Sequence, residues 1–166
     1  MSLADTIISI LETRQSVDGF KVISLGCGKS GAEASPKWGH LTGVDIYPYP
    51  DAPVNKFIAH DIRKIREIIA DKSFDLVLCL DIIEHLERDE GFNLIADSEA
   101  IATKAVVFYT PLKWDKNIVD KSSWAYGNPY NLHKSLWGKE DFSGYECYKV
   151  FPDTENPVGF LAVKWL

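Results

Sequence analysis

The chain has 166 residues, with 18 Lys and Arg against 24 Asp and Glu, which gives a formal net charge of −6. This charge argues against binding to nucleic acid, which depends on cationic side chains that neutralise phosphates. The three scattered cysteines, Cys27, Cys79 and Cys147, argue against a disulfide framework and structural zinc and favour a reducing cytoplasm. No apolar run reaches the ~20 residues of a membrane span. We therefore expect one soluble cytoplasmic domain over residues 1–166, with no membrane or nucleic-acid partner.

The first two thirds of the chain alternate helix-prone and strand-prone segments. Apolar residues at helical spacing predict helices, the last of them with Phe92, Ile95 and Ile101 turned inward. Short, almost wholly apolar runs predict strands that are buried on both faces. This alternation is typical of a parallel sheet with helices on both faces. The expected helices cover 2–14, 62–71 and 89–103, and the expected strands cover 20–25, 41–46, 56–59, 74–80 and 104–109.

The last third has a different pattern. Residues 110–132 hold prolines, asparagines and aromatics without a clear period, and a loop of this length is usually functional or disordered. A short helix is expected near 136–142. Two β-prone runs follow at 146–151 and 159–166, and the turn-rich segment between them predicts an antiparallel hairpin.

A glycine-rich loop directly follows the first predicted strand. Residues 25–31 read LGCGKSG, in which Gly26, Gly28 and Gly31 match the spacing of a dinucleotide-binding loop. Such glycines let the backbone approach a ligand closely and present free N–H groups at a helix N-terminus. The alternative is a tight strand-to-helix turn that binds no ligand.

Asp45 closes the second predicted strand, at the distance past the glycines where an acidic residue meets a ribose. A carboxylate there can accept hydrogen bonds from both ribose hydroxyls. The alternative is an exposed acid in a turn. On these two features alone, a nicotinamide-binding protein and a methyltransferase are equally good interpretations.

Four sequence blocks separate these interpretations: ISLGCG at 23–28, VD at 44–45, DI at 61–62, and FDLV at 74–77 continuing through EHL at 84–86. In this order the chain resembles the class I S-adenosylmethionine-dependent methyltransferases, specifically their small-molecule (type 11-like) branch. The resemblance covers about residues 20–166. It implies a Rossmann-like, doubly wound seven-stranded α/β sheet in the order 3-2-1-4-5-7-6, with strand 7 antiparallel. A nicotinamide dehydrogenase would also need a substrate domain, which 166 residues cannot supply.

The resemblance implies S-adenosylmethionine as cofactor and S-adenosylhomocysteine as product. Asp45, with Ile46 beside it, would bind the ribose, and Asp61 and Ile62 would bind the adenine. The remaining implied cofactor-binding residues lie around the methionine part and are Gly26, Cys27, Gly28, Leu80 and Asp81. The chain departs from the family at Ser24, where an acid is usual, at Gly31, one residue late, and at 102–104, which replace a Lys-Pro-Gly-Gly turn.

The segment 81–85 (DIIEH) admits two interpretations. An acid followed three residues later by Glu is a plausible helix start. The functional alternative places Glu84 or His85 at the mouth of the substrate site. We expect no metal, because two adjacent residues cannot form a metal site alone and the sequence shows no second cluster.

The aromatic segment after the fifth strand is the expected source of substrate specificity. The stretch 128–137 resembles an N-P-x-x-x-H-x-S-x-W pattern of this branch. His133 is its candidate general base, because imidazole takes up a proton near neutral pH; the alternative is a packing histidine beside Trp137. Tyr109 is expected either to touch substrate or to pack. The further substrate-proximal candidates are Glu84, His85, Trp114, Trp124, Tyr130 and Trp137.

The sequence therefore predicts methyl transfer from S-adenosylmethionine to an oxygen or nitrogen of a small-molecule acceptor. Two other classes stay open, an NAD-binding oxidoreductase and a non-catalytic methyltransferase-like binding domain. A homodimer or an activating partner protein is also considered, because the domain is near the minimum size of the family.

Overall fold

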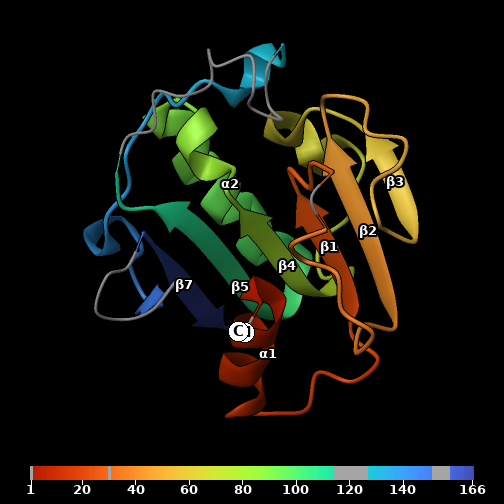
Figure 1. Cartoon of the computed structure of the whole chain (residues 1–166). Coiled ribbons are helices and arrows are strands. Elements are labelled where there is room, and N and C mark those ends of the chain that lie inside the picture. Colours follow the sequence, from red (N-terminus) through yellow and green to blue (C-terminus); the bar gives the residue numbers. More distant parts are fainter. Residues whose placement is uncertain (1, 30, 114–126, 151–157) are drawn as a thin grey trace.

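Seven strands form one mixed sheet in the order β3-β2-β1-β4-β5-β7-β6 (Figure 1). The computed structural model describes residues 2–29, 31–113, 127–150 and 158–166. The pairs β1–β2, β2–β3, β1–β4 and β4–β5 are parallel, whereas β7 is antiparallel to both β5 and β6. The predicted strand order and the antiparallel strand 7 are thus confirmed. The strands are β1 (Lys21–Leu25), β2 (His40–Asp45), β3 (Lys56–Ala59), β4 (Phe74–Leu80), β5 (Ala102–Pro111), β6 (Glu146–Val150) and β7 (Gly159–Trp165).

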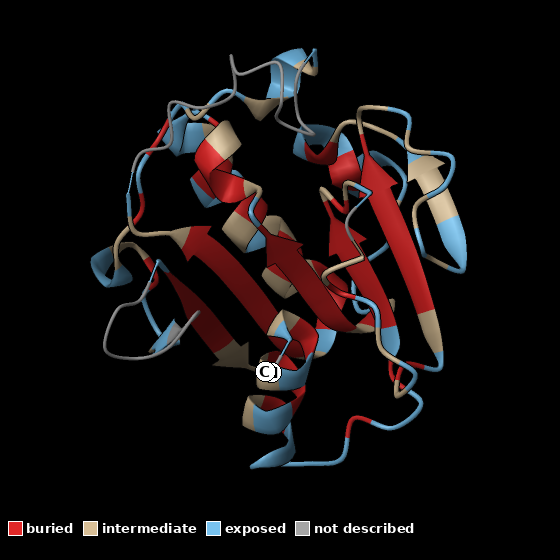
Figure 2. Cartoon of the chain, in the orientation of Figure 1, coloured by how far each residue is buried: buried red, intermediate tan, exposed pale blue. Residues whose placement is uncertain are grey.

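The central strands are buried on both faces, as Figure 2 shows for β1, β4 and β5. Their near-continuous apolar runs suit a strand that is covered by other elements on each side. Because β1, β2 and β4 are parallel, their carboxyl ends meet at one edge of the sheet, toward which their arrowheads point in Figure 1. Ligands of open α/β sheets bind at this edge.

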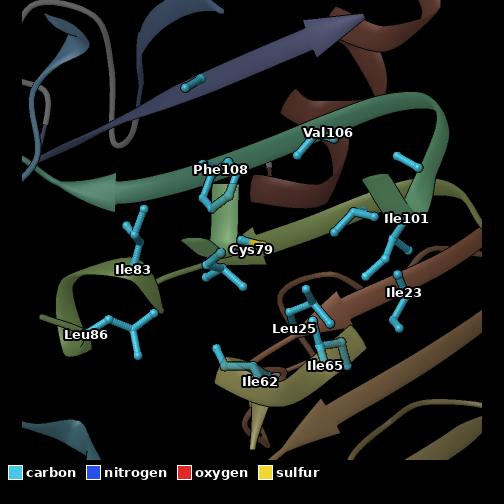
Figure 3. Close-up of a cluster of buried hydrophobic side chains, with 14 of the residues drawn as sticks. Ile23, Leu25, Ile62, Ile65, Cys79, Ile83, Leu86, Ile101, Val106 and Phe108 are labelled. Atoms are coloured by element: carbon cyan, nitrogen blue, oxygen red, sulfur yellow. The ribbon is translucent and has the colours of Figure 1, made fainter. Parts of the chain in front are cut away.

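Helices α1 (Leu3–Glu12) and α2 (Arg88–Ile101) pack on opposite faces of the sheet. A capping box begins α1, since the Ser2 hydroxyl accepts from the Asp5 N–H and the Asp5 carboxylate accepts from the Ser2 N–H. The apolar side of α1 packs against side chains of β1, β4 and β5. The other face holds the cluster of Figure 3, in which Ile101 of α2 lies with Ile23, Cys79 and Phe108 of the strands.

The inward face of α2 differs from the prediction. Phe92 is 42% exposed rather than turned inward, and Leu94 is buried in its place. Gly91 explains this rotation, because the Trp137 ring lies against it: a Cβ at Gly91 would be 2.2 Å from Trp137 Cζ2. The contact between Gly91 and the Trp137 ring therefore decides which side of α2 faces the core, and the spacing of the apolar residues does not.

The segment predicted as a helix over 62–71 is instead a 3-10 helix, η1 (Ile62–Glu67), with non-helical φ and ψ at Lys64. Its apolar side still faces the core, through Ile62 and Ile65. Among the described residues, the other 3-10 helices are η2 (Ile83–His85), η4 (Pro129–Asn131) and η5 (Lys139–Asp141). The short helix predicted near 136–142 is thus only the three-residue η5.

The connection from β1 to β2 is also unlike the prediction. The glycine loop was expected to open a helix, but the residues that the structure describes between 26 and 39 form turns and no helix. Gly31, Pro36 and Gly39 interrupt this short connection, and none of these residue types favours a helix interior. The N–H groups of the loop are therefore presented by a turn.

None of the helices in the described part of the chain has the length and apolar character needed to span a lipid bilayer.

Candidate functional site

A cleft of about 380 Å³ opens at the carboxyl ends of β1, β2 and β4. It brings together all nine predicted cofactor residues, although they come from four separate segments of the chain. It also includes His133, Glu84, His85 and Tyr130 from the predicted acceptor side. Residues that sequence analysis did not single out for the site complete the wall: Ala32, Glu33, Tyr49, Arg63, Ile82, Leu86, Pro111, Asn128, Pro129, Asn131, Lys134 and Ser24.

The glycine loop forms one wall of the cleft. Gly26 has φ +75°, and a Cβ there would lie 2.3 Å from Ile82 Cγ1. The loop can therefore pass close to the end of β4 only with glycine at this position. Cys27 is buried, and burial raises the pKa of its thiol to about 12, which makes it a packing group rather than a nucleophile.

Asp45 ends β2 and binds the glycine loop directly. Its Oδ2 accepts from the Gly28 N–H at 2.9 Å, and its Oδ1 accepts from the Tyr47 N–H at 2.9 Å. Burial raises the pKa of this carboxyl, while the backbone N–H groups oppose that effect. Each carboxylate oxygen has a second lone pair, so Asp45 can accept further hydrogen bonds from a pair of ligand hydroxyls.

Glu33 is an acidic residue of the cleft that sequence analysis missed. Glu33 is only 3% exposed to solvent, and its Oε1 has no hydrogen-bond partner in the described part of the chain. Burial raises the pKa of the Glu33 carboxyl, and a hydrogen bond with Ser24 partly opposes this. The carboxylate thus stands beside the position where the family usually has an acid. A buried carboxylate without a full set of partners is suited to a cationic ligand group.

Asp61 caps η1 and pairs with Arg63. Its Oδ1 accepts from the Arg63 N–H at 3.0 Å, and its Oδ2 lies 2.6 Å from Arg63 Nη2. These hydrogen bonds lower the pKa of Asp61 and keep it ionised. Arg63 also contacts Glu90 on α2. The predicted adenine-binding role therefore requires Asp61 to share its lone pairs with Arg63.

The end of β4 carries two neighbouring carboxyls. Asp81 has φ +50°, an uncommon conformation that Asp tolerates better than most residues, and its N–H donates to the Tyr109 carbonyl at 2.9 Å. Glu84 is 2% exposed, and its Oε2 accepts from the Thr110 hydroxyl at 3.2 Å. Burial, followed by the charge of Asp81, raises the pKa of Glu84. The helix start predicted for 81–85 is only the 3-10 turn η2, and the Glu84 side chain points into the cleft.

The chain after η4 is tied to η2 by backbone hydrogen bonds. The Glu84 carbonyl accepts from the N–H groups of Lys134 at 2.8 Å and Ser135 at 3.1 Å. This pairing places His133 beside His85, with ring centroids 4.9 Å apart. Burial, followed by the proximity of His133, lowers the pKa of His85 to about 4, so its imidazole is neutral at physiological pH. The Glu84–His85 pair and His133 therefore form one cluster.

A contact across the mouth of the cleft joins two other segments. Asn128 Nδ2 donates to the Tyr49 hydroxyl at 2.9 Å, which links the loop after β2 to the start of η4. Tyr130 is exposed by 47% and lies next to this contact in the chain. Together these residues form the rim of the cleft.

Two predicted substrate-proximal aromatics do not line the cleft. Trp137 is 2% exposed and packs in the core, where its Nε1 donates to the Ile83 carbonyl at 3.2 Å. Tyr109 is 6% exposed and packs over Gly159, where a Cβ would lie 2.5 Å from its hydroxyl. For Tyr109 the packing alternative is the observed one, whereas the prediction that Trp137 lies near the substrate is wrong, because its ring is buried in the core. Trp114 and Trp124 lie outside the described residues.

Comparison with known proteins is consistent with this site. The family model described as a methyltransferase domain matches residues 23–96. No curated protein sequence matches the chain. Many solved structures share the fold, including magnesium protoporphyrin IX methyltransferase from Synechocystis PCC 6803 with bound SAM, at TM-score 0.66 and 15% identity over 98% of this chain and 77% of that one.

Two further similar structures extend the comparison. A Burkholderia thailandensis 1,6-didemethyltoxoflavin-N1-methyltransferase with bound S-adenosylhomocysteine has TM-score 0.70 and 12% identity, over 98% of this chain and 77% of that one. A complex between the Haloferax volcanii Trm112 methyltransferase activator and its candidate methyltransferase has TM-score 0.63 and 15% identity, over 93% of this chain and 86% of that one. The chain therefore has the fold of class I S-adenosylmethionine-dependent methyltransferases, and its residues 23–96 match a methyltransferase domain in sequence.

Proposed function

We propose that this chain transfers the methyl group of S-adenosylmethionine to an oxygen or nitrogen of a small-molecule acceptor. The observation that carries the proposal is the continuity of the cleft, which runs from the glycine loop and Asp45 past Asp81 to His133. A cofactor held by the glycine loop and Asp45 would direct its sulfonium toward His133. Similar proteins that act on a porphyrin and on a toxoflavin precursor also support a small-molecule acceptor.

The cofactor end offers hydrogen-bonding groups for each part of S-adenosylmethionine. Asp45 would accept from the ribose hydroxyls, and Asp61 with Ile62 would border the adenine. Glu33 would supply a negative charge near the methionine part, beside Ser24. This carboxylate compensates for the acid that position 24 lacks, because charge-assisted hydrogen bonds to a cationic ligand group can come from a neighbouring segment.

In the reaction, a lone pair of the acceptor attacks the methyl carbon, and the S–C bond breaks with its electron pair remaining on sulfur. The sulfonium is a good leaving group, so the protein mainly orients the reactants and excludes water. His133 lies at the acceptor end, where we propose that it promotes loss of the acceptor's proton. A homodimer or activating partner stays a prediction.

The first test is a calorimetric titration of the purified protein with S-adenosylhomocysteine, with NADH as the comparison ligand. We expect micromolar binding of S-adenosylhomocysteine and no binding of NADH. Binding of NADH alone would contradict the proposal and favour the oxidoreductase. Binding of neither would contradict the proposal for this chain by itself and would favour a non-catalytic domain or one that requires a partner.

The second test concerns the acceptor end. Candidate hydroxyl and amine compounds are screened for release of S-adenosylhomocysteine, and the best acceptor is then compared between the wild type and His133→Ala. We expect the variant to keep its affinity for S-adenosylhomocysteine and to lose about 100-fold or more in turnover, the size of a general acid–base contribution. Unchanged turnover would remove His133 from the chemistry.

A further inference from the structure

We propose that Glu84, His85 and His133 bind one divalent transition-metal ion, which in turn holds an oxygen of the acceptor. The three side chains can each offer one ligand atom, and these atoms lie within 4.8 Å of one another. All three residues line the cleft at its acceptor end. The acceptor part of this inference rests on the proposed methyl transfer, whereas ion binding does not.

The spacing suits a metal ion after small side-chain adjustments. Ligand atoms about 2.0–2.2 Å from one ion lie roughly 3–4 Å apart, and His85 Nε2 already lies 4.0 Å from Glu84 Oε1. The sequence does not reveal this cluster, because only Glu84 and His85 are adjacent in the chain. The backbone pairing of Lys134 and Ser135 with the Glu84 carbonyl supplies the third member.

The hydrogen bonds around the cluster leave ligand atoms directed inward. His85 Nδ1 lies 3.3 Å from the Leu132 carbonyl, which can only accept, so Nδ1 carries the hydrogen and Nε2 keeps its lone pair. Glu84 Oε2 accepts from the Thr110 hydroxyl, which leaves Oε1 toward His85. Metal-binding histidines and carboxylates usually have such outer partners, which set their orientation.

The donor set indicates the class of ion. Two imidazoles and one carboxylate suit ions such as Zn²⁺, Co²⁺, Mn²⁺ or Fe²⁺, whereas Mg²⁺ prefers oxygen ligands and retains waters. Asp81 adds a second carboxyl group beside Glu84 in the same cleft. Nearby negative charge favours a cation.

Three protein ligands leave coordination positions open, which is the pattern of a catalytic rather than a structural site. An ion there would bind a hydroxyl of the acceptor and make its proton easier to lose. The hydroxyl oxygen then attacks the methyl carbon, the S–C electron pair stays on sulfur, and the proton passes to water. This inference limits the acceptor to compounds that carry a hydroxyl group. His133 then promotes loss of the hydroxyl proton by holding the ion.

The test uses tag-free protein that has been stripped with a chelator and then titrated calorimetrically with Co²⁺, Zn²⁺ and Mn²⁺. We expect one-to-one binding of at least one ion and, with Co²⁺, absorption bands in the visible that report nitrogen ligands. Glu84→Gln and His133→Gln should each weaken binding about tenfold or more. His40→Gln is the matched control, because His40 begins β2, at the opposite end of that strand from the cleft.

Absence of one-to-one binding would overturn the proposal, as would an equal loss of affinity in His40→Gln and His133→Gln. Glu84 is buried, so Glu84→Gln is interpreted only if its circular dichroism matches the wild type; otherwise the half-buried His133 decides. S-Adenosylhomocysteine is titrated into the same stripped protein. Its binding without any ion binding would overturn the metal site alone, whereas ion binding without cofactor binding would overturn the proposed methyl transfer alone.

Discussion

The Asp45 carboxylate and the Gly28 N–H are joined by a hydrogen bond of 2.9 Å, which ties the end of β2 to the glycine loop at the end of β1. Asp45 therefore has two functions in the structure, since it holds the loop and also faces the cleft. Gly28 itself has φ +55° and open space where a Cβ would project.

Replacing Asp45 should weaken cofactor binding strongly. We expect Asp45→Ala to lower the affinity for S-adenosylhomocysteine by about 2–3 kcal/mol, because charge-assisted hydrogen bonds are lost. Calorimetric titration measures this difference. Asp51→Ala, at an exposed position in the following loop, is the control and should bind as the wild type does. Unchanged affinity in Asp45→Ala would remove Asp45 from the site.

The two glycines of the loop should differ in their tolerance of a side chain. Both have positive φ, so alanine at either position costs roughly 1 kcal/mol in backbone strain. Only at Gly26 would the new Cβ also collide with Ile82, which adds about 1–3 kcal/mol. We expect urea unfolding to show a clearly larger loss of stability for Gly26→Ala than for Gly28→Ala. Equal losses would mean that Ile82 can move aside.

Glu33 should be unfavourable for the free protein and favourable for ligand binding. Burial raises the pKa of its carboxyl above the usual 4.5 in the folded state. The folded protein therefore binds more protons than the unfolded chain, and this group's contribution to stability falls as pH rises above about 4.5. Glu33→Gln removes that decline, so its stabilising effect in urea unfolding should be larger at about pH 7.5 than at about pH 5.

The same variant should bind S-adenosylhomocysteine about tenfold more weakly, because a charged partner of the ligand's cationic group is lost. Glu67→Gln, at an exposed position on η1, is the control for both measurements. If Glu33→Gln is less stable than the wild type at neutral pH and binds S-adenosylhomocysteine normally, Glu33 stabilises the fold and does not bind the cofactor.

Trp137 should matter for stability rather than for contact with a substrate. Its buried ring packs against Gly91, so we expect Trp137→Ala to cost about 3–5 kcal/mol in unfolding free energy. Phe92→Ala is the matched control, because Phe92 meets the Trp137 ring edge to face but is 42% exposed, so its loss should cost well under half as much. Comparable losses would contradict the core position of Trp137.

The sequence by itself determined the order of the sheet and which strand ends meet at the cleft. The buried runs of β1, β4 and β5 are local patterns, and their order follows from the resemblance that the glycine loop, Asp45 and the block at 74–86 carry. The glycine loop, Asp45 and Asp81 each lie at the carboxyl end of a strand. Parallel strands bring their carboxyl ends together, so placing the strands also places the residues.

Only the tertiary structure decided how His85, Glu33 and Trp137 are placed. His85 meets the Leu132 carbonyl across 47 residues of chain, and Glu33 reaches Ser24 from a connection that was expected to be helical. Trp137 is drawn into the core because Gly91 leaves room for its ring. These positions depend on contacts between distant segments and on the space that neighbouring side chains leave, and a local pattern of residue types contains neither.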